Sequence, residues 1–166
     1  MRVTFVGEPL ARVHADILVT GFFEDARPLQ GFTGQIDWLA GGILSKLIVG
    51  RRVTGRLKEA TLVALPTFST PRILCVGLGK SAAYGYLTIH QVAEALLPLL
   101  GALRVGAAAV EVLGAHARGL DAAIAVRTFM KAWYNGAREP GIDVVFVVPK
   151  GAHPQQLDRR LREMGV

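Results

Sequence analysis

Short apolar segments rich in β-branched residues recur along the chain, separated by longer segments whose apolar residues fall at helical spacing. The short segments predict six strands, at 2–6, 16–20, 60–65, 72–76, 108–113 and 142–148. Several of them are apolar at consecutive positions, which is typical of strands covered on both faces. Because strands and helices alternate, the pattern predicts an α/β sandwich, a sheet with helices on both faces.

Four segments predict the helices, namely 34–49, 87–101, 119–136 and 153–165. Gly41-Gly42 weakens the first helix by about 1 kcal/mol for each glycine relative to alanine. In the second, Thr88 followed three residues later by Gln91 predicts an N-cap with a capping box. Pro98 predicts a kink or an end there, because it removes one intrahelical hydrogen bond and collides with the preceding turn.

Composition fits one folded domain over residues 1–166. Hydrophobic residues make up 51% and charged residues 19%, which excludes a disordered chain. The mean hydropathy is +0.37, yet no apolar run approaches the ~20 residues of a membrane-spanning helix. The first residues do not have the pattern of a signal peptide, and the single Cys75 lies in an apolar run. We therefore expect a cytoplasmic protein with a buried, unreactive thiol and no membrane contact.

Basic residues outnumber acidic ones by 19 to 13, giving a net charge of +6 and a pI near 10.0. This charge permits a nucleic-acid or anionic partner without requiring one. Arg159, Arg160 and Arg162 lie opposite the apolar stripe of the last predicted helix, where they could contact phosphates. One interpretation is therefore a DNA- or RNA-binding module, and the other is an ordinary solvated helix face.

The stretch RILCVGLGKSAAYG (72–85) places a glycine-rich turn after a strand. The Walker pattern fails, because Leu74 stands where its first glycine is needed. The dinucleotide fingerprint is met by Gly77, Gly79 and Ala82, but the helix start and the following acidic residue are misplaced. Two interpretations remain open: the turn holds an anion with Lys80 nearby, or the glycines only permit a tight exit from the strand.

The distribution of reactive side chains does not predict a catalytic site. A two-metal hydrolase needs several carboxylates around cations ~3.5–4 Å apart, whereas the thirteen acidic residues here are scattered. The four histidines lie far apart, and no serine has a histidine and an acid in a suggestive context. We expect no metal site, no cofactor and no enzymatic activity from this chain alone.

Several stretches read together resemble a known family. ADILVTGFFEDARPLQGFTGQIDWLAGGILSKLI (15–48), then Gly55, then TPRILCVGLGK (70–80), is similar to the N-terminal domain of the leucyl aminopeptidase, or cytosol aminopeptidase, family. The resemblance implies a macro-domain-like fold, a three-layer α/β/α sandwich with a mixed sheet. It also implies a larger C-terminal catalytic domain in such enzymes, whose metal-binding motifs this sequence lacks. We expect a stand-alone, non-catalytic homologue.

The macro-domain likeness implies a binding site for an ADP-ribose-like ligand. Position by position, Asp16 corresponds to the acid that contacts adenine, Gly31 and Gly34 to a first loop, and Gly77, Gly79 and Lys80 to a second, phosphate-binding loop. Thr20–Phe23 departs from the asparagine-rich strand end of such domains, which argues against ADP-ribose hydrolysis. The expected role is ligand binding, regulation or assembly. The partners to consider are a phosphate-containing ligand, a second copy of the chain or a separate catalytic subunit.

Overall fold

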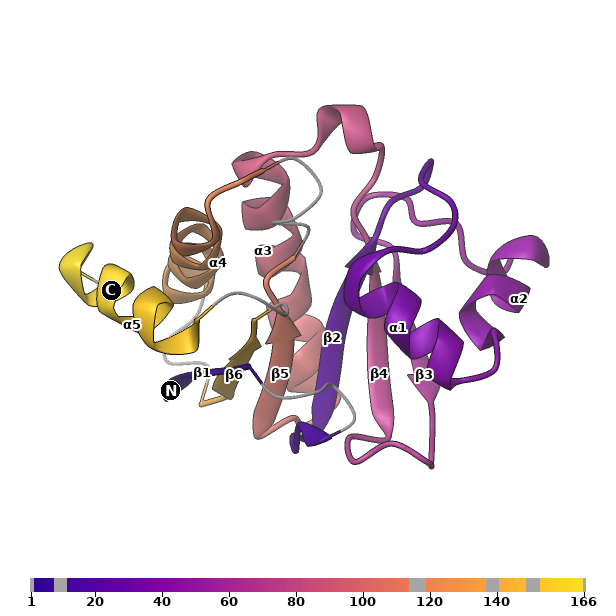
Figure 1. The fold of residues 1–166 in the computed structure, drawn as a ribbon, viewed down its shortest axis with the longest axis horizontal. Helices are drawn as coiled ribbons and strands as arrows, with labels where there is room; N and C mark the ends of the chain where they lie inside the picture. Colours follow the sequence, from indigo (N-terminus) through magenta and orange to yellow (C-terminus); the bar gives the residue numbers. More distant parts are fainter. Residues whose placement is uncertain (1, 8–11, 114–118, 137–140, 149–152, 166) are drawn as a thin grey trace.

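A computed structural model describes residues 2–7, 12–113, 119–136, 141–148 and 153–165. Its centre is a six-stranded sheet in the order β1-β6-β5-β2-β4-β3 (Figure 1). All neighbouring strands are parallel except β3 and β4, so the sheet is mixed. All six predicted strands are confirmed, with ends that differ by at most two residues: β1 (Val3–Val6), β2 (Ile17–Phe22), β3 (Ala60–Ala64), β4 (Arg72–Gly77), β5 (Ala107–Glu111) and β6 (Asp143–Val147).

Helices cover both faces of the sheet and form two separate cores. One face packs against α1 (Gly31–Leu39) and α2 (Ile43–Val49), and the other against α3 (Tyr86–Ala102) and α4 (Ala122–Gly136). Successive strand residues alternate between the cores, as Leu18 and Val19 do on β2. The predicted three-layer α/β/α sandwich is confirmed.

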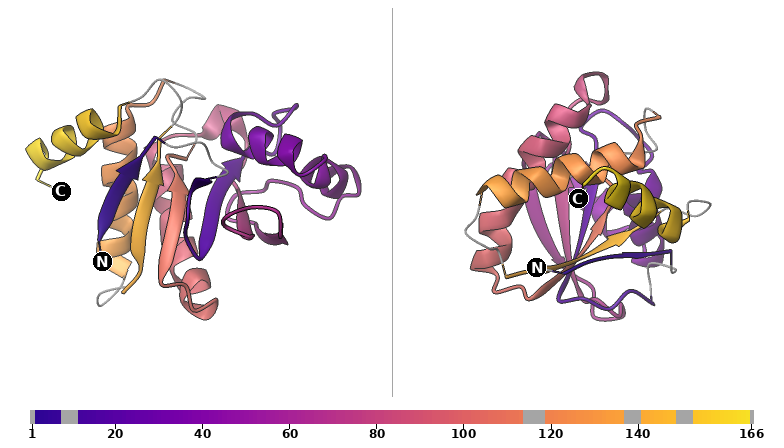
Figure 2. Two further views of the ribbon diagram at one scale, coloured as in Figure 1. Left: turned by 60° about the horizontal axis from the view of Figure 1, so that its bottom comes forward. Right: turned by 90° about the vertical axis from the view of Figure 1, so that its left-hand side faces the viewer.

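The last helix, α5 (Pro154–Glu163), lies beside β1 at one end of the sheet (Figure 2). Its apolar side consists of Leu157 and Leu161, which are buried, while its other side carries the charged residues. Among the described residues, no helix has the length and apolarity needed to cross a bilayer.

The predicted helix at 34–49 is two helices, which corrects the sequence interpretation. Gly41 and Gly42 have φ values of +66° and +78°, in the left-handed region that glycine adopts most easily, and they separate α1 from α2. Asp37 stabilises the break: its Oδ1 accepts hydrogen bonds from the amides of Leu44 and Ser45 at the start of α2. The glycine pair therefore ends one helix and leads into the next.

The start and the proline of α3 also differ from prediction. The N-cap is Gly85, and Thr88 lies inside the first turn with its hydroxyl directed back to the carbonyl of Ala83 (3.5 Å). Pro98 does not end the helix, which continues to Ala102. Leu100, on the turn after the proline, is fully buried, so packing against the sheet outweighs the hydrogen bond that Pro98 removes.

Candidate functional site

The chain changes direction between β2 and β5. These strands are parallel neighbours, but the chain leaves β2 toward α1 on one face of the sheet and leaves β5 toward α4 on the other. In open α/β sheets a crevice forms where connections from adjacent strands diverge in this way, and ligands bind there. On this topological ground we take the carboxyl ends of β2 and β5, together with the start of α1, as the candidate site, and we call it the switch-point crevice.

A cluster of buried polar groups lies at this crevice. The hydroxyl of Thr20, on β2, donates to Oε2 of Glu111, the last residue of β5, at 2.5 Å. The hydroxyl of Thr33, in the first turn of α1, lies 2.7 Å from that of Thr20 and 2.8 Å from the carbonyl oxygen of Gly21. The amides of Gly21 (3.4 Å) and Phe32 also hydrogen-bond Glu111. Side chains from two strands and a helix thus converge on one carboxyl group.

Glu111 has an unusual protonation equilibrium. It is 2% exposed, and burial raises its pKa to about 7, although the hydrogen bonds from Thr20, Gly21 and Phe32 oppose that rise. A buried acid with a shifted pKa beside a crevice is a marker of a functional site. Sequence reasoning counted Glu111 only among scattered acids. The sequence does place this carboxyl group inside the apolar run AAVEVL (108–113), and that position is the feature that could have indicated a buried acid.

The predicted phosphate turn after β4 uses its amides internally. The amide of Gly77 donates to the carbonyl of Glu59 (2.7 Å), that of Leu78 to Phe22 (2.9 Å) and that of Gly79 to Gly55 (3.0 Å). An anion held by this turn would have to accept hydrogen bonds from these same three consecutive N–H groups. The turn is therefore fastened to neighbouring backbone, while the Lys80 side chain is exposed.

The next residue of that turn, Ser81, already binds an anionic side chain. Its amide and hydroxyl contact the Asp25 carboxylate at 2.9 and 3.3 Å. The hydrogen bond from the Ser81 amide, assisted by the charge of Lys80, lowers the pKa of Asp25. The chain therefore supplies its own anion at the position where the sequence predicted a phosphate.

The predicted glycines of the first loop occupy two different environments. Gly31 opens α1 with a φ of +60°, next to the amide of Phe32 that contacts Glu111, so it lies at the crevice. Gly34 is needed for close packing: a Cβ there would lie 2.4 Å from the carbonyl oxygen of Leu29. The structure thus brings Gly31 to the point where β2 and β5 end. The Gly77–Lys80 turn lies at the same edge of the sheet, on the other side of β2, where Gly77 is the register partner of Phe22.

Asp16 lies at the opposite edge of the sheet. It precedes β2, whereas the crevice lies at the carboxyl end of that strand, about 20 Å away at ~3.3 Å per residue. Its Oδ2 accepts hydrogen bonds from the amides of Ala107 (2.9 Å) and Gly106 (2.7 Å), which lower its pKa. The structure does not bring Asp16 together with the predicted loops, and its carboxylate instead fixes the start of β5.

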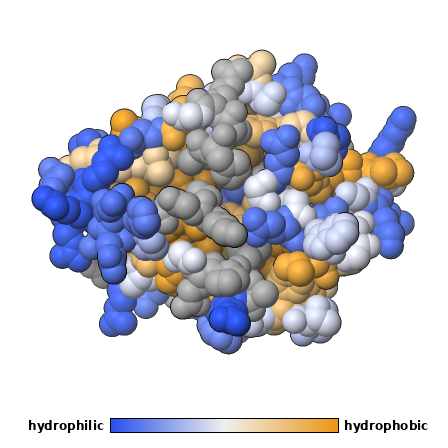
Figure 3. Space-filling model, in the orientation of Figure 1, coloured by the Kyte–Doolittle hydropathy of each residue, from blue (hydrophilic) through white to orange (hydrophobic). Residues whose placement is uncertain are grey.

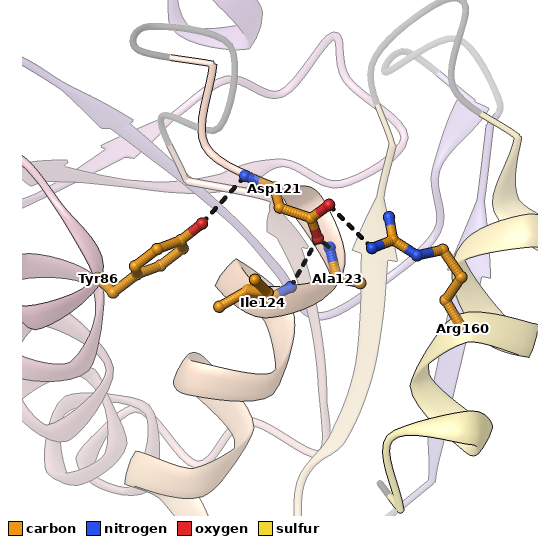
Figure 4. A network of polar contacts seen from close by, with 5 residues as sticks. All are labelled: Tyr86, Asp121, Ala123, Ile124 and Arg160. Carbon is orange, nitrogen blue, oxygen red and sulfur yellow. Dashed lines mark hydrogen bonds and ion pairs between the residues drawn. The ribbon is translucent and has the colours of Figure 1, made fainter.

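The three arginines of the nucleic-acid interpretation are all paired with acids. Arg159 and Arg162 bind Glu163 and Asp158 within α5, each at 3.0 Å. Arg160 binds Asp121 at 2.9 Å (Figure 4). These pairs offset the positive charge of the helix, so nothing in the described residues favours α5 as a phosphate-binding surface.

Figure 4 shows that Asp121 links three helices. Its Oδ1 accepts hydrogen bonds from the amides of Ala123 and Ile124 and so caps α4, and its own amide donates to the hydroxyl of Tyr86 at the start of α3. The Arg160 side chain reaches the same carboxylate from α5. Arg160 therefore has a structural role in holding α5 against α4.

The described residues contain no group of three His, Cys, Asp or Glu side chains that could hold a metal ion. Cys75 is buried in β4, and burial raises the pKa of its thiol to about 12. At neutral pH this thiol is protonated and has little nucleophilic reactivity.

A second surface feature lies over α1 and α2. Trp38 is 85% exposed beside an open pocket of about 600 Å³, and apolar residues gather over these helices on the right-hand side of Figure 3. The pocket is lined by Pro28, Leu29, Gly34, Asp37, Trp38, Gly41, Gly42 and Ser45. Exposed tryptophans beside apolar surface are typical of protein interfaces.

The sequence matches a family model described as "Cytosol aminopeptidase family, N-terminal domain" over residues 19–138. A probable cytosol aminopeptidase of Trichormus variabilis is 30% identical over 97 residues, which are 58% of this chain and 20% of that protein. A second, from Cyanothece, is 30% identical over 82 residues, covering 49% of this chain and 17% of that protein. The matches therefore span about a fifth of the length of these relatives.

Solved structures share the fold at low sequence identity. Tomato leucine aminopeptidase superposes with a TM-score of 0.73 and 18% identity, covering 98% of this chain and 35% of that one. The DarG macrodomain of Mycobacterium tuberculosis gives 0.71 and 19%, covering 90% and 98%. The macrodomain of Trypanosoma brucei in complex with ADP-ribose gives 0.70 and 14%, covering 99% and 69%. The macro-domain-like fold is confirmed.

Proposed function

The chain belongs to the cytosol aminopeptidase family as its N-terminal domain, and we propose that it acts as a non-catalytic domain that binds a nucleoside diphosphate of the ADP-ribose type. The observation that carries this proposal is the switch-point crevice, where Gly31, Thr33 and Glu111 meet at the ends of β2 and β5. The ADP-ribose complex of a protein with the same fold supports the choice of ligand by analogy.

Binding without hydrolysis fits the residues of the crevice. Thr20 and Thr33 are the hydroxyl groups there, and both are engaged in the buried cluster. Thr20–Phe23 stands where the resemblance implies an asparagine-rich strand end.

Titration calorimetry with ADP-ribose tests the proposal. We expect saturable binding to the wild-type protein and at least tenfold weaker binding to Thr33→Val, because the Thr33 hydroxyl holds the first turn of α1 against Gly21. Lys80→Ala serves as the control and should change the affinity less than threefold, since the Gly77–Gly79 amides are already engaged.

Three outcomes contradict parts of this proposal. If wild-type protein does not bind ADP-ribose, the ligand assignment is wrong, and if Lys80→Ala abolishes binding while Thr33→Val has no effect, the site is the turn after β4. Turnover of a leucyl p-nitroanilide substrate in the presence of zinc or manganese would contradict the non-catalytic assignment.

Self-association is the second candidate function, favoured by the surface over α1 and α2. Trp38 protrudes next to an open pocket, so a twofold arrangement could place the indole of each copy in the pocket of the other. The 600 Å³ volume is ample for one indole side chain. A separate catalytic subunit is the alternative occupant of the same surface.

We expect Trp38→Asp to convert a wild-type dimer into a monomer, because it places a charge at the centre of the apolar surface. Light scattering coupled to size-exclusion chromatography measures this mass. Leu87→Asp, which alters another exposed apolar side chain (70% exposed) on α3, is the matched control and should leave the mass unchanged. A monomeric wild-type protein at all accessible concentrations would rule self-association out.

A further inference from the structure

The cluster around Glu111 contains three close oxygen–oxygen contacts, and each needs one hydrogen to be a hydrogen bond. When Glu111 is ionised, the cluster has one hydrogen too few for them. Three oxygen–oxygen contacts form a chain: Glu111 to Thr20, Thr20 to Thr33, and Thr33 to the carbonyl of Gly21. With Glu111 as a carboxylate, only the two threonine hydrogens are available for these contacts. One contact then brings together two acceptors with no hydrogen between them.

A proton on Glu111 completes the chain. Glu111 then donates to Thr20, Thr20 donates to Thr33, and Thr33 donates to the carbonyl of Gly21, so every contact holds one hydrogen. The amides of Gly21 and Phe32 still find acceptor oxygens on the carboxyl group. The observed geometry is therefore fully satisfied by the neutral acid.

We propose that Glu111 determines the charge of the ligand that the switch-point crevice accepts: the neutral acid admits a phosphate group, and the carboxylate excludes it. This inference rests on the proposed nucleotide-binding function. A carboxylate beside the first turn of α1 repels a nearby phosphate and cancels the attraction of the helix N-terminus for anions, whereas the neutral acid carries no charge that would do so. Binding of a phosphate-containing ligand should therefore be accompanied by uptake of a proton.

Among the described residues, the groups coupled to Glu111 do not titrate in the same range. Cys75 on β4 and Tyr84 before α3 are the ionisable side chains that interact with it electrostatically. Burial raises the pKa of Cys75 to about 12 and raises that of Tyr84 as well, so both stay neutral between pH 6 and pH 8. A change in affinity across this range that is lost in Glu111→Gln is therefore assigned to Glu111.

The size of the effect follows from the fraction of protein that carries the proton. With a pKa of about 7 for Glu111, roughly nine molecules in ten are protonated at pH 6 and one in ten at pH 8. If only the protonated form binds, the affinity falls about tenfold over these two pH units. ADP-ribose is a suitable probe, because it lacks the terminal phosphate monoester whose second ionisation falls near pH 6.

The test is titration calorimetry of the whole chain with ADP-ribose at pH 6 and pH 8, each in two buffers of different ionisation enthalpy. We expect about tenfold tighter binding at pH 6 and uptake of close to one proton at pH 8. Glu111→Gln should bind at pH 8 about as tightly as the wild-type protein does at pH 6, with no proton uptake. Glu163→Gln, at the exposed end of α5, is the matched control and should behave as the wild type.

The outcomes separate this inference from the proposed function. Equal affinities at pH 6 and pH 8 without proton uptake, or tighter binding at pH 8, would overturn the role of Glu111 and leave nucleotide binding intact. No binding by the wild type or by Glu111→Gln at either pH would reject both. The pH and buffer series on wild-type protein decides the question even if Glu111→Gln does not fold.

Discussion

Glu111→Gln will make the protein less sensitive to alkaline pH, and the gain in stability relative to the wild type will grow as the pH rises. The folded-state pKa of Glu111, about 7, is above the ordinary value of 4.5. The folded protein therefore binds more protons than the unfolded chain between these values, and this contribution to stability is lost as the pH rises through 7. The difference between these two pKa values corresponds to roughly 3 kcal/mol.

Urea unfolding at pH 5, 6, 7 and 8 measures this effect. The difference in unfolding free energy between Glu111→Gln and wild type should increase by about 2.5 kcal/mol over the series, because the unfolded chain has already lost most of its Glu111 protons at pH 5. Asp16, Asp25, Glu59 and Asp121 have lowered pKa values and lose stabilisation only at more acid pH; they are common to both proteins and cancel in the difference. Parallel curves for the two proteins would show that Glu111 is ionised at no cost in the folded state.

The strands and layers were predictable because they depend on local pattern. Consecutive apolar residues such as those of β4 and β5 predict strands buried on both faces. In the structure both strands lie between the two cores, and nearly all of their residues are buried. The break between α1 and α2 was not predicted, because whether Gly41 and Gly42 end a helix depends on the cap that the Asp37 side chain supplies to the start of α2. The glycine pair was visible in the sequence, but whether it would break the helix depended on tertiary packing.

Part of the site could have been placed more accurately from strand direction. Asp16 precedes a strand and Gly77 ends one, so in a parallel sheet they lie at opposite edges. Glu111 could not have been assigned its role in this way. Its partner Thr20 is 91 residues away, and its pKa results from burial that the sequence does not reveal.

The glycines of the turn after β4 show how a motif can have a structural origin. Gly55 approaches β4 so closely that a Cβ on Gly77 would lie 1.9 Å from the carbonyl oxygen of Arg56 and 2.6 Å from the carbonyl carbon of Gly55. Gly79 has a φ of +73° and donates its amide to Gly55. Close backbone packing and a left-handed conformation account for both glycines without a ligand.

Gly77→Ala should therefore destabilise the protein by about 3 kcal/mol or more, because the obstructing atoms belong to backbone that is hydrogen-bonded on both sides and cannot move aside cheaply. Gly101→Ala is the matched control: it lies in α3 with no atom within 4 Å of the added Cβ, and we expect it to stabilise by about 0.5–1 kcal/mol through helix propensity. Thermal and urea unfolding measure both changes. A Gly77→Ala protein with wild-type stability but no affinity for ADP-ribose would show that this glycine serves the ligand, and the turn after β4 would replace the switch-point crevice as the binding site.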